Sequence, residues 1–145
     1  MDVELYFDGA SKGNGGPSGA GYWVKCEDSS YGGYKFLGNA TNNVAEYNGL
    51  ILGLKNLGKY REHQIKVYGD SKLVICQMNR IWKVKAEHLI LLWNEAQELI
   101  KDFKDISFIH IDRSLNSKAD LLANLAIRSK TPTLTLMEGG PITTL

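Results

Sequence analysis

Cysteine is scarce in this sequence, and the two cysteines that occur are far apart. Cys26 and Cys76 form no closely spaced pair and no cluster with histidine, so the spacing excludes a zinc site of the usual kind. We interpret both as reduced thiols in the core of an intracellular protein. The sequence leaves open whether they pair, because only the fold could bring them together.

Long apolar runs and a targeting segment are also lacking. No apolar run reaches the roughly 18 residues of a membrane span, and the first residues show no basic segment followed by an apolar core. We therefore expect a soluble, cytoplasmic protein that has no membrane partner.

An excess of charge of either sign is missing as well. The 17 basic and 16 acidic residues leave a formal net charge of +1, so a nucleic-acid site would have to be a local patch. The 145 residues, 43% of them hydrophobic, are enough for one folded domain. We expect a monomer, with a domain at residues 1–130 and an extended or mobile tail at 131–145.

Two short β-prone runs each end in an aspartate that small residues follow. The first run, residues 3–11, contains Asp8, and the second, residues 65–71, contains Asp70. If these strands are parallel neighbours, their axes lie about 4.8 Å apart and the two carboxylates meet at one edge of the sheet. A buried pair of this kind needs a cation.

Two further acids fall near the starts of predicted helices. Glu46 is expected in the first turn of a helix with apolar residues at helical spacing, capped by Asn42 or Asn43. Asp120 is expected in the first turn of the last helix, with Asn116 as its cap. Each acid taken alone could simply complement a helix dipole, and that alternative stays open.

The order of the predicted elements indicates an α/β fold with one mixed sheet. The first three strands have short connections, which favours an antiparallel meander, whereas the fourth follows a helical crossover and should be parallel to the first. Gly49 and Gly53 predict close packing of the crossover helix on the sheet. The predicted strands cover residues 3–11, 20–26, 34–38, 65–70 and 106–111.

Two other stretches have compositions that favour ligand binding but also allow a purely structural interpretation. The glycine-dense residues 9–19 allow close approach of a ligand, or they form a mobile hairpin loop. Residues 80–88 combine Trp82, Lys83 and Lys85, a set suited to sugars and phosphates. The alternative is a solvated connection with Trp82 in the core.

Asp8, Glu46, Asp70 and Asp120 thus occupy positions where α/β folds place ligands. Carboxylates so close together repel one another, and oxygen-only ligands favour Mg²⁺ or Mn²⁺ over zinc.

Four blocks of the sequence, in order, resemble the type 1 ribonucleases H, particularly their compact archaeal and bacterial members. The blocks are residues 7–14 (Phe-Asp-Gly-Ala-Ser-Lys-Gly-Asn), 41–46 (Thr-Asn-Asn-Val-Ala-Glu), 69–71 (Gly-Asp-Ser) and 116–120 (Asn-Ser-Lys-Ala-Asp). The resemblance covers about residues 2 to 129. It implies the ribonuclease H-like fold, with five strands in the order 3-2-1-4-5 flanked by helices.

The resemblance also implies an activity. Asp8, Glu46, Asp70 and Asp120 match the family's metal-binding carboxylates, which hold two Mg²⁺ ions and hydrolyse the RNA strand of an RNA–DNA hybrid. The products carry a 5′-phosphate and a 3′-hydroxyl.

Substrate contacts follow from the same resemblance. Asn14, Asn42 and Gln77 fall where the family reads ribose 2′-hydroxyls or neighbouring groups. Thr41, with Trp82 and Lys83 nearby, resembles its pocket for a DNA-strand phosphate, and Lys85 is expected to bind substrate beside them.

Product release is assigned in the family to a loop before the last acid. Many bacterial members have a histidine in that loop, whereas Arg113 is in its register here. His110 is nearby but falls within the predicted fifth strand, so a structural or surface role for it remains the alternative.

Two alternative functions remain open from the sequence. One is a nuclease of the same fold that acts on double-stranded RNA or on DNA. The other is a non-catalytic nucleic-acid-binding module, which the presence of all four acids argues against, because unpaired buried carboxylates would only reduce stability.

Overall fold

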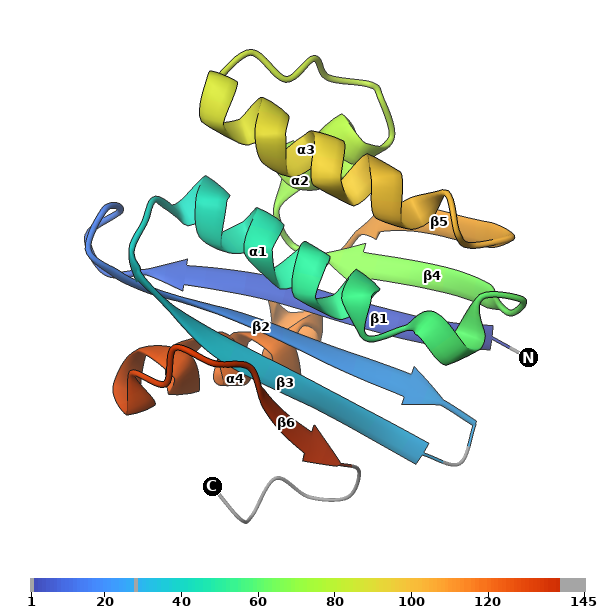
Figure 1. The fold of residues 1–145 in the computed structure, drawn as a ribbon, viewed down its shortest axis with the longest axis horizontal. Helices are drawn as coiled ribbons and strands as arrows, with labels where there is room; N and C mark the ends of the chain where they lie inside the picture. The colour runs from blue at the N-terminus through green and yellow to red at the C-terminus, as the bar shows by residue number, and fades with distance from the viewer. Residues whose placement is uncertain (1, 28, 139–145) are drawn as a thin grey trace.

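The computed structural model describes residues 2–27 and 29–138, and these form one mixed sheet with helices on both faces (Figure 1). The strands are β1 (Asp2–Ser11), β2 (Pro17–Cys26), β3 (Ser29–Asn39), β4 (Gln64–Gly69), β5 (Asp105–His110) and β6 (Thr135–Glu138). The helices are α1 (Asn42–Lys55), α2 (Lys72–Met78), α3 (Glu87–Ile100) and α4 (Ser117–Ser129), with short 3₁₀ turns η1 (Gly58–Tyr60) and η2 (Arg113–Leu115).

The sheet has the order β5-β4-β1-β2-β3-β6. Strands β1, β2 and β3 form the predicted antiparallel meander, and β4 is parallel to both β1 and β5. The predicted order 3-2-1-4-5 is therefore confirmed for strands β1 to β5.

The predicted strand count of five is wrong, because β6 adds a sixth strand antiparallel to β3. Its residues belong to the stretch that the sequence assigned to a tail. They join the sheet because Met137 packs against the cluster formed by Trp23, Tyr34 and Leu122 on the α4 face. Residues 139–145, the end of the expected tail, lie outside the described residues.

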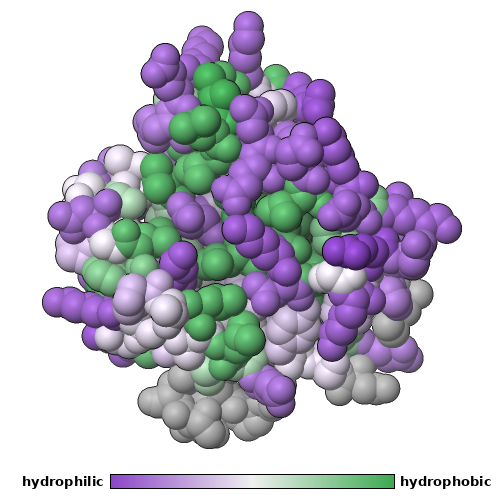
Figure 2. All heavy atoms as spheres, viewed as in Figure 1, coloured by the Kyte–Doolittle hydropathy of each residue, from purple (hydrophilic) through white to green (hydrophobic). Residues whose placement is uncertain are grey.

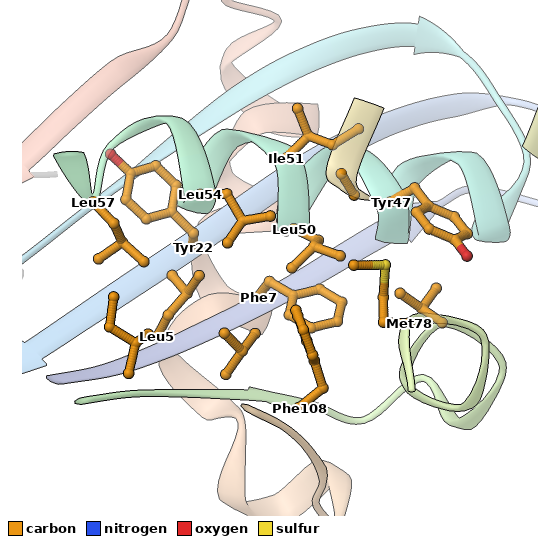
Figure 3. Packing of buried hydrophobic residues seen from close by; sticks show 14 of the residues in the cluster. Leu5, Phe7, Tyr22, Tyr47, Leu50, Ile51, Leu54, Leu57, Met78 and Phe108 are labelled. Carbon is orange, nitrogen blue, oxygen red and sulfur yellow. The ribbon is translucent and has the colours of Figure 1, made fainter. Parts of the chain in front are cut away.

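The two faces of the sheet carry different helices. Helix α1, with α2 and α3, covers one face, and α4 covers the other (Figure 1). Alternate residues of β1 follow this division, since Leu5 and Phe7 pack under α1 whereas Tyr6 contacts the α4-side cluster. Figure 3 shows Leu5 and Phe7 meeting Leu50 and Leu54 of α1 in the main core.

Glycines bring both helix layers unusually close to the strands. A Cβ atom on Gly49 would overlap the Asp8 carbonyl, and one on Gly53 would meet the side chain of Leu5, which confirms the predicted close packing of α1. Gly21 of β2 likewise allows α4 to pack closely on the sheet, because an added Cβ would meet the backbone of Ala119 and Ala123. The helices therefore hold their side chains close to the strands.

Cys26 and Cys76 are both free thiols and only partly buried. Among residues 2–27 and 29–138, no helix has the length and apolar character needed to span a membrane.

Candidate active site

Three carboxylates converge where the β1–β4 pairing ends. The last paired residues are Phe7 and Gly69, and Asp8 and Asp70 follow them directly. Glu46 reaches the same point from α1, and one oxygen from each of the three carboxylates lies within 4.8 Å of the others. The predicted meeting of Asp8 and Asp70 at one edge is therefore confirmed.

The sequence suggested that Asp8 ends its strand, but the structure places it within the strand. Strand β1 continues to Ser11 while paired with β2, and Asp8 itself lies opposite Gly21. Only the parallel pairing with β4 stops before Asp8. Its carboxylate therefore stays anchored in the sheet while the position beside it is open.

Glu46 lies one turn deeper in its helix than predicted. Helix α1 begins at Asn42, so Glu46 is outside the first turn, and the cap is Thr41, whose Oγ1 accepts from the Val44 amide at 3.4 Å. A Cβ on Gly9 would overlap the backbone of Ala45 and Glu46, so this part of α1 lies directly on β1. Contact with the strand, not the helix dipole, accounts for the position of the glutamate.

Asp120 approaches from the opposite face of the sheet. It lies in the first turn of α4, as predicted, and lines the same cleft of about 480 Å³ as the other three acids. It is not part of the close group of three. Asn124, one turn further along α4, donates from Nδ2 to the Asp120 carboxylate at 3.2 Å.

The closeness of the acids favours their neutral forms. Burial, and then the charge of Asp70, raises the pKa of Asp8 to about 7, although the Gly9 amide donates to its Oδ1 at 2.9 Å. Burial and the charges of Asp8 and Asp70 raise the pKa of Glu46 well above its usual value. Burial also raises the pKa of Asp70, against hydrogen bonding from Asn116 and the charge of Arg113.

The donor set fits a divalent cation. The Oε1 atom of Glu46 is buried without a hydrogen-bond partner, and within the described ranges no lysine or arginine forms an ion pair with any of the four acids. All the converging ligands are carboxylate oxygens, which hard divalent cations prefer. A bound cation would remove both the repulsion and the unpaired acceptor.

Asn14 and Asn42 lie together beside the cleft. Asn14 is in the exposed β1–β2 connection with φ of 52°, and its Oδ1 accepts from the Asn42 amide at 2.9 Å. Asn42 lines the cleft itself. Thr41 is exposed beside them, and its hydroxyl serves α1 as the cap.

Gln77 is placed away from any exposed substrate surface, contrary to the sequence interpretation. It is only 4% exposed, and its Oε1 accepts from the Tyr47 hydroxyl between α1 and α2. The helical phase of α2 turns this residue inward, so its amide belongs to the interior.

The connection between α2 and α3 is exposed and basic. Trp82 is 43% exposed, which excludes the alternative that it lies in the core, and Lys72 Nζ lies 5.8 Å from its ring centroid. Lys83 and Lys85 are exposed on the same connection. Figure 2 shows apolar and hydrophilic side chains together at the α2–α3 end of the molecule.

Arg113 lines the cleft from η2. His110 belongs to the fifth strand, as predicted, but it is the last residue of β5, which ends one residue before the predicted boundary. His110 is exposed, with Nε2 3.3 Å from the backbone oxygen of Asp70.

Three residues near the acids were missed or misjudged at the level of sequence. Lys12 and Asn124 line the cleft, and the spacing of Asn124 four residues after Asp120 is a signal that could have identified it. Asn116 was predicted to cap α4, but its side chain makes no capping hydrogen bond. Its Nδ2 instead donates to the Phe7 carbonyl at 2.9 Å.

Fold and site together define an α/β protein with an acidic, divalent-metal type of centre at the edge of a parallel strand pair. The sequence matches the family model described as reverse transcriptase-like over residues 6–126. The ribonuclease HI of Halobacterium salinarum is 39% identical over 127 residues, which cover 86% of this chain and 64% of that protein.

Solved structures agree with this match. The crystal structure of RNase H1 from Halobacterium salinarum superimposes with a TM-score of 0.80 at 37% identity, covering 89% of this chain and 99% of that one. LC11-RNase H1, solved in complex with an RNA/DNA hybrid, has a TM-score of 0.83 at 31% identity, covering 88% and 98%. The chain belongs to the ribonuclease H family.

Some relatives are much longer than this chain. A bifunctional protein of Mycobacterium tuberculosis is 43% identical over 130 residues, which make up 88% of this chain but only 36% of that protein. The chain thus spans about a third of the length of this relative.

Proposed function

We propose that this chain is an Mg²⁺-dependent endoribonuclease that cleaves the RNA strand of RNA–DNA hybrids, leaving a 5′-phosphate and a 3′-hydroxyl. The observation that carries the proposal is the convergence of Asp8, Glu46 and Asp70 oxygens within 4.8 Å, with Glu46 Oε1 buried and unpaired. Family membership supports the reaction, and the hybrid bound by LC11-RNase H1 supports the substrate class.

The carboxylates would hold the metal from three directions. Asp8 comes from β1, Asp70 from the residue after the adjacent β4, and Glu46 from the helix above them, while Asp120 enters from the other face. Two divalent ions at this position would supply charge stabilisation to the attacking water and to the departing 3′-oxygen. In the hydrolysis step, the water oxygen would bond to phosphorus, the bond from phosphorus to O3′ would break, and the proton that the water loses would pass to the 3′-oxygen.

Substrate recognition is assigned to the residues around the cleft. The Asn14–Asn42 pair lies beside the acids, where amides can read the 2′-hydroxyl that distinguishes RNA from DNA. Trp82, Lys83 and Lys85 are exposed and suited to sugar and phosphate contacts. All four acids belong to one chain, which supports action as a monomer.

The test is the cleavage of end-labelled duplexes of about one to two helical turns. RNA–DNA hybrid, double-stranded RNA and double-stranded DNA are compared with Mg²⁺, with Mn²⁺ and with chelator. We expect metal-dependent cutting of the hybrid's RNA strand, and its loss in Asp8→Asn and Asp70→Asn. The exposed Asp102→Asn serves as the matched control.

Other outcomes would change the assignment in different ways. Preferred cutting of double-stranded RNA would replace the substrate class and keep the site. Binding of duplexes without cutting would favour the non-catalytic module. Normal cleavage by both aspartate variants would overturn the metal assignment.

A further inference from the structure

Asn116 is a buried amide between the sheet and the start of α4. The residue is only 1% exposed to solvent. Its Nδ2 atom donates to the carbonyl of Phe7, which is 109 positions earlier in the sequence, at 2.9 Å. It makes no side-chain cap for α4, although it directly precedes that helix. The amide therefore serves a long-range contact and not the local one.

The orientation of this amide leaves one polar atom unsatisfied. Its NH₂ group donates to the Phe7 carbonyl, which can only accept. The same amide acts on the neighbouring Asp70 carboxyl, because hydrogen bonding from Asn116 lowers the pKa of that group against the effect of burial. The Oδ1 atom consequently points elsewhere and is buried without a partner. A buried unpaired acceptor is costly, so its presence calls for an explanation.

The two contacts of Asn116 join the segments that carry the acids. Phe7 immediately precedes Asp8 on β1, and Asp70 follows β4. The backbone oxygen of Asn116 also accepts from the Asp120 amide at 3.1 Å, which ties α4 to the same point. One residue thus contacts the segments of three acids that come from different elements.

We propose that Asn116 is a positioning residue that sets the relative placement of Asp8, Asp70 and Asp120 for binding a divalent cation. This inference rests on the metal site of the proposed function. The unpaired Oδ1 is the cost of turning the donor side of the amide toward the acids. Groups that orient metal ligands in this way typically change metal affinity by 10- to 100-fold when removed.

The chain offers a matched control in Asn79. Its Nδ2 also donates to a strand carbonyl of the same sheet, that of Phe108 at 3.0 Å, but Asn79 does not line the cleft that holds the acids. Asn79→Ala therefore removes the same kind of hydrogen bond without altering the site. Asn116→Ala and the volume-conserving Asn116→Leu remove the donors of interest.

The experiment is a calorimetric titration of each purified protein with Mn²⁺ and with Mg²⁺, without nucleic acid, at matched pH and temperature. We expect both Asn116 variants to bind about 10-fold or more weakly than the wild type, and Asn79→Ala to bind within about 2-fold of it. Urea unfolding in chelator measures the stability of each variant. A purely structural role would lower stability in the Asn116 and Asn79 variants and leave metal affinity unchanged, which would overturn the inference.

A second measurement needs no variant. In the wild-type protein, the Asn116 side-chain amide signals in nitrogen–proton correlation spectra should move during Mg²⁺ titration, because that amide donates beside Asp8 and acts on the Asp70 carboxyl. The Asn79 signals should stay in place. If the protein binds Mg²⁺ but the Asn116 signals do not move, the positioning role of Asn116 is overturned and the metal site stands. If the wild type binds neither Mg²⁺ nor Mn²⁺, the metal site itself is overturned.

Discussion

Gly49 of α1 lies directly over the backbone carbonyl of Asp8, so close that a Cβ atom would overlap it. This contact holds α1 against β1 next to the acidic cluster, with Glu46 one helical turn away. The identity of one small residue therefore controls the distance between two carboxylates of the proposed metal site.

The substitution Gly49→Ala should lower stability although alanine is the better helix former. Helix propensity favours alanine by about 1 kcal/mol, but overpacking against the Asp8 carbonyl typically costs about 1–3 kcal/mol and also moves Glu46. We expect a net loss in the free energy of unfolding and weaker metal binding. Urea unfolding and metal titration measure the two effects.

Gly58→Ala is the control, since a Cβ there meets only the end of the Arg61 side chain at 3.8 Å. It should change stability by no more than about 0.5 kcal/mol. Equal stability of the two variants would contradict the packing argument.

The metal-free protein should become less stable as the pH rises from about 4 to 7. Asp8 has an ordinary pKa of 3.8 when unfolded and about 7 when folded, mainly because of burial. Between these values the folded state binds a proton that the unfolded state has released, so the free energy of unfolding falls with rising pH. One pKa unit corresponds to about 1.4 kcal/mol.

Asp8→Asn removes the titrating carboxyl group, so the free energy of unfolding of this variant should fall less as the pH rises. In chelator at pH 8 we expect the variant to be more stable than the wild type by roughly 2–4 kcal/mol, whereas Asp102→Asn should follow the wild-type curve. Chemical unfolding across the pH series measures this. A full wild-type slope in Asp8→Asn would show that another group causes it.

Trp82→Ala and Lys83→Ala should weaken substrate binding more than they slow the chemical step. Both side chains are exposed, and neither lines the cleft that holds the carboxylates. Stacking on an aromatic side chain contributes about 1–3 kcal/mol. We expect KM to rise roughly 5- to 10-fold at near-physiological salt with kcat little changed. Leu91→Ala, which removes another exposed apolar side chain, is the control. An unchanged KM would remove this connection from the substrate site.

Arg113→Ala should slow repeated turnover. Arg113 lines the cleft and its charge acts on Asp70, so it can attract the phosphate of the departing product. An exposed ion pair of this kind contributes up to about 1 kcal/mol, which corresponds to a fall in kcat of about 2- to 5-fold. Multiple-turnover and single-turnover assays separate release from chemistry, and the exposed Arg128→Ala is the control. A loss confined to single-turnover cleavage would assign Arg113 to the chemical step.

Much of the site could be predicted because its signals are local. Asp8 and Asp70 each follow a β-prone run, and a crossover connection makes two such runs parallel, so their meeting needs no knowledge of side-chain packing. Asp120 is likewise in the predicted helical turn. Glu46 was identified correctly as a member of the cluster, but its turn was not, because Thr41 and not Asn42 or Asn43 caps α1.

The errors share a different origin. Gln77 has the chemistry of a substrate reader, but the phase of α2 turns it toward Tyr47. Residues 135–138 have the composition of a tail, but β3 has an open edge and the α4-side cluster has room for Met137. In each case, a distant surface decides what a polar or apolar side chain contacts.

The sequence by itself determined the class of fold, the order of the inner strands and the four acids, since strand alternation, helical spacing and crossover connections depend on neighbouring residues. Only the tertiary structure decided that Asn116 turns its amide toward the Phe7 carbonyl, that β6 completes the sheet, and that Gln77 is buried. These features depend on contacts between residues that are distant in the sequence. Such contacts form only when the helices pack on the sheet.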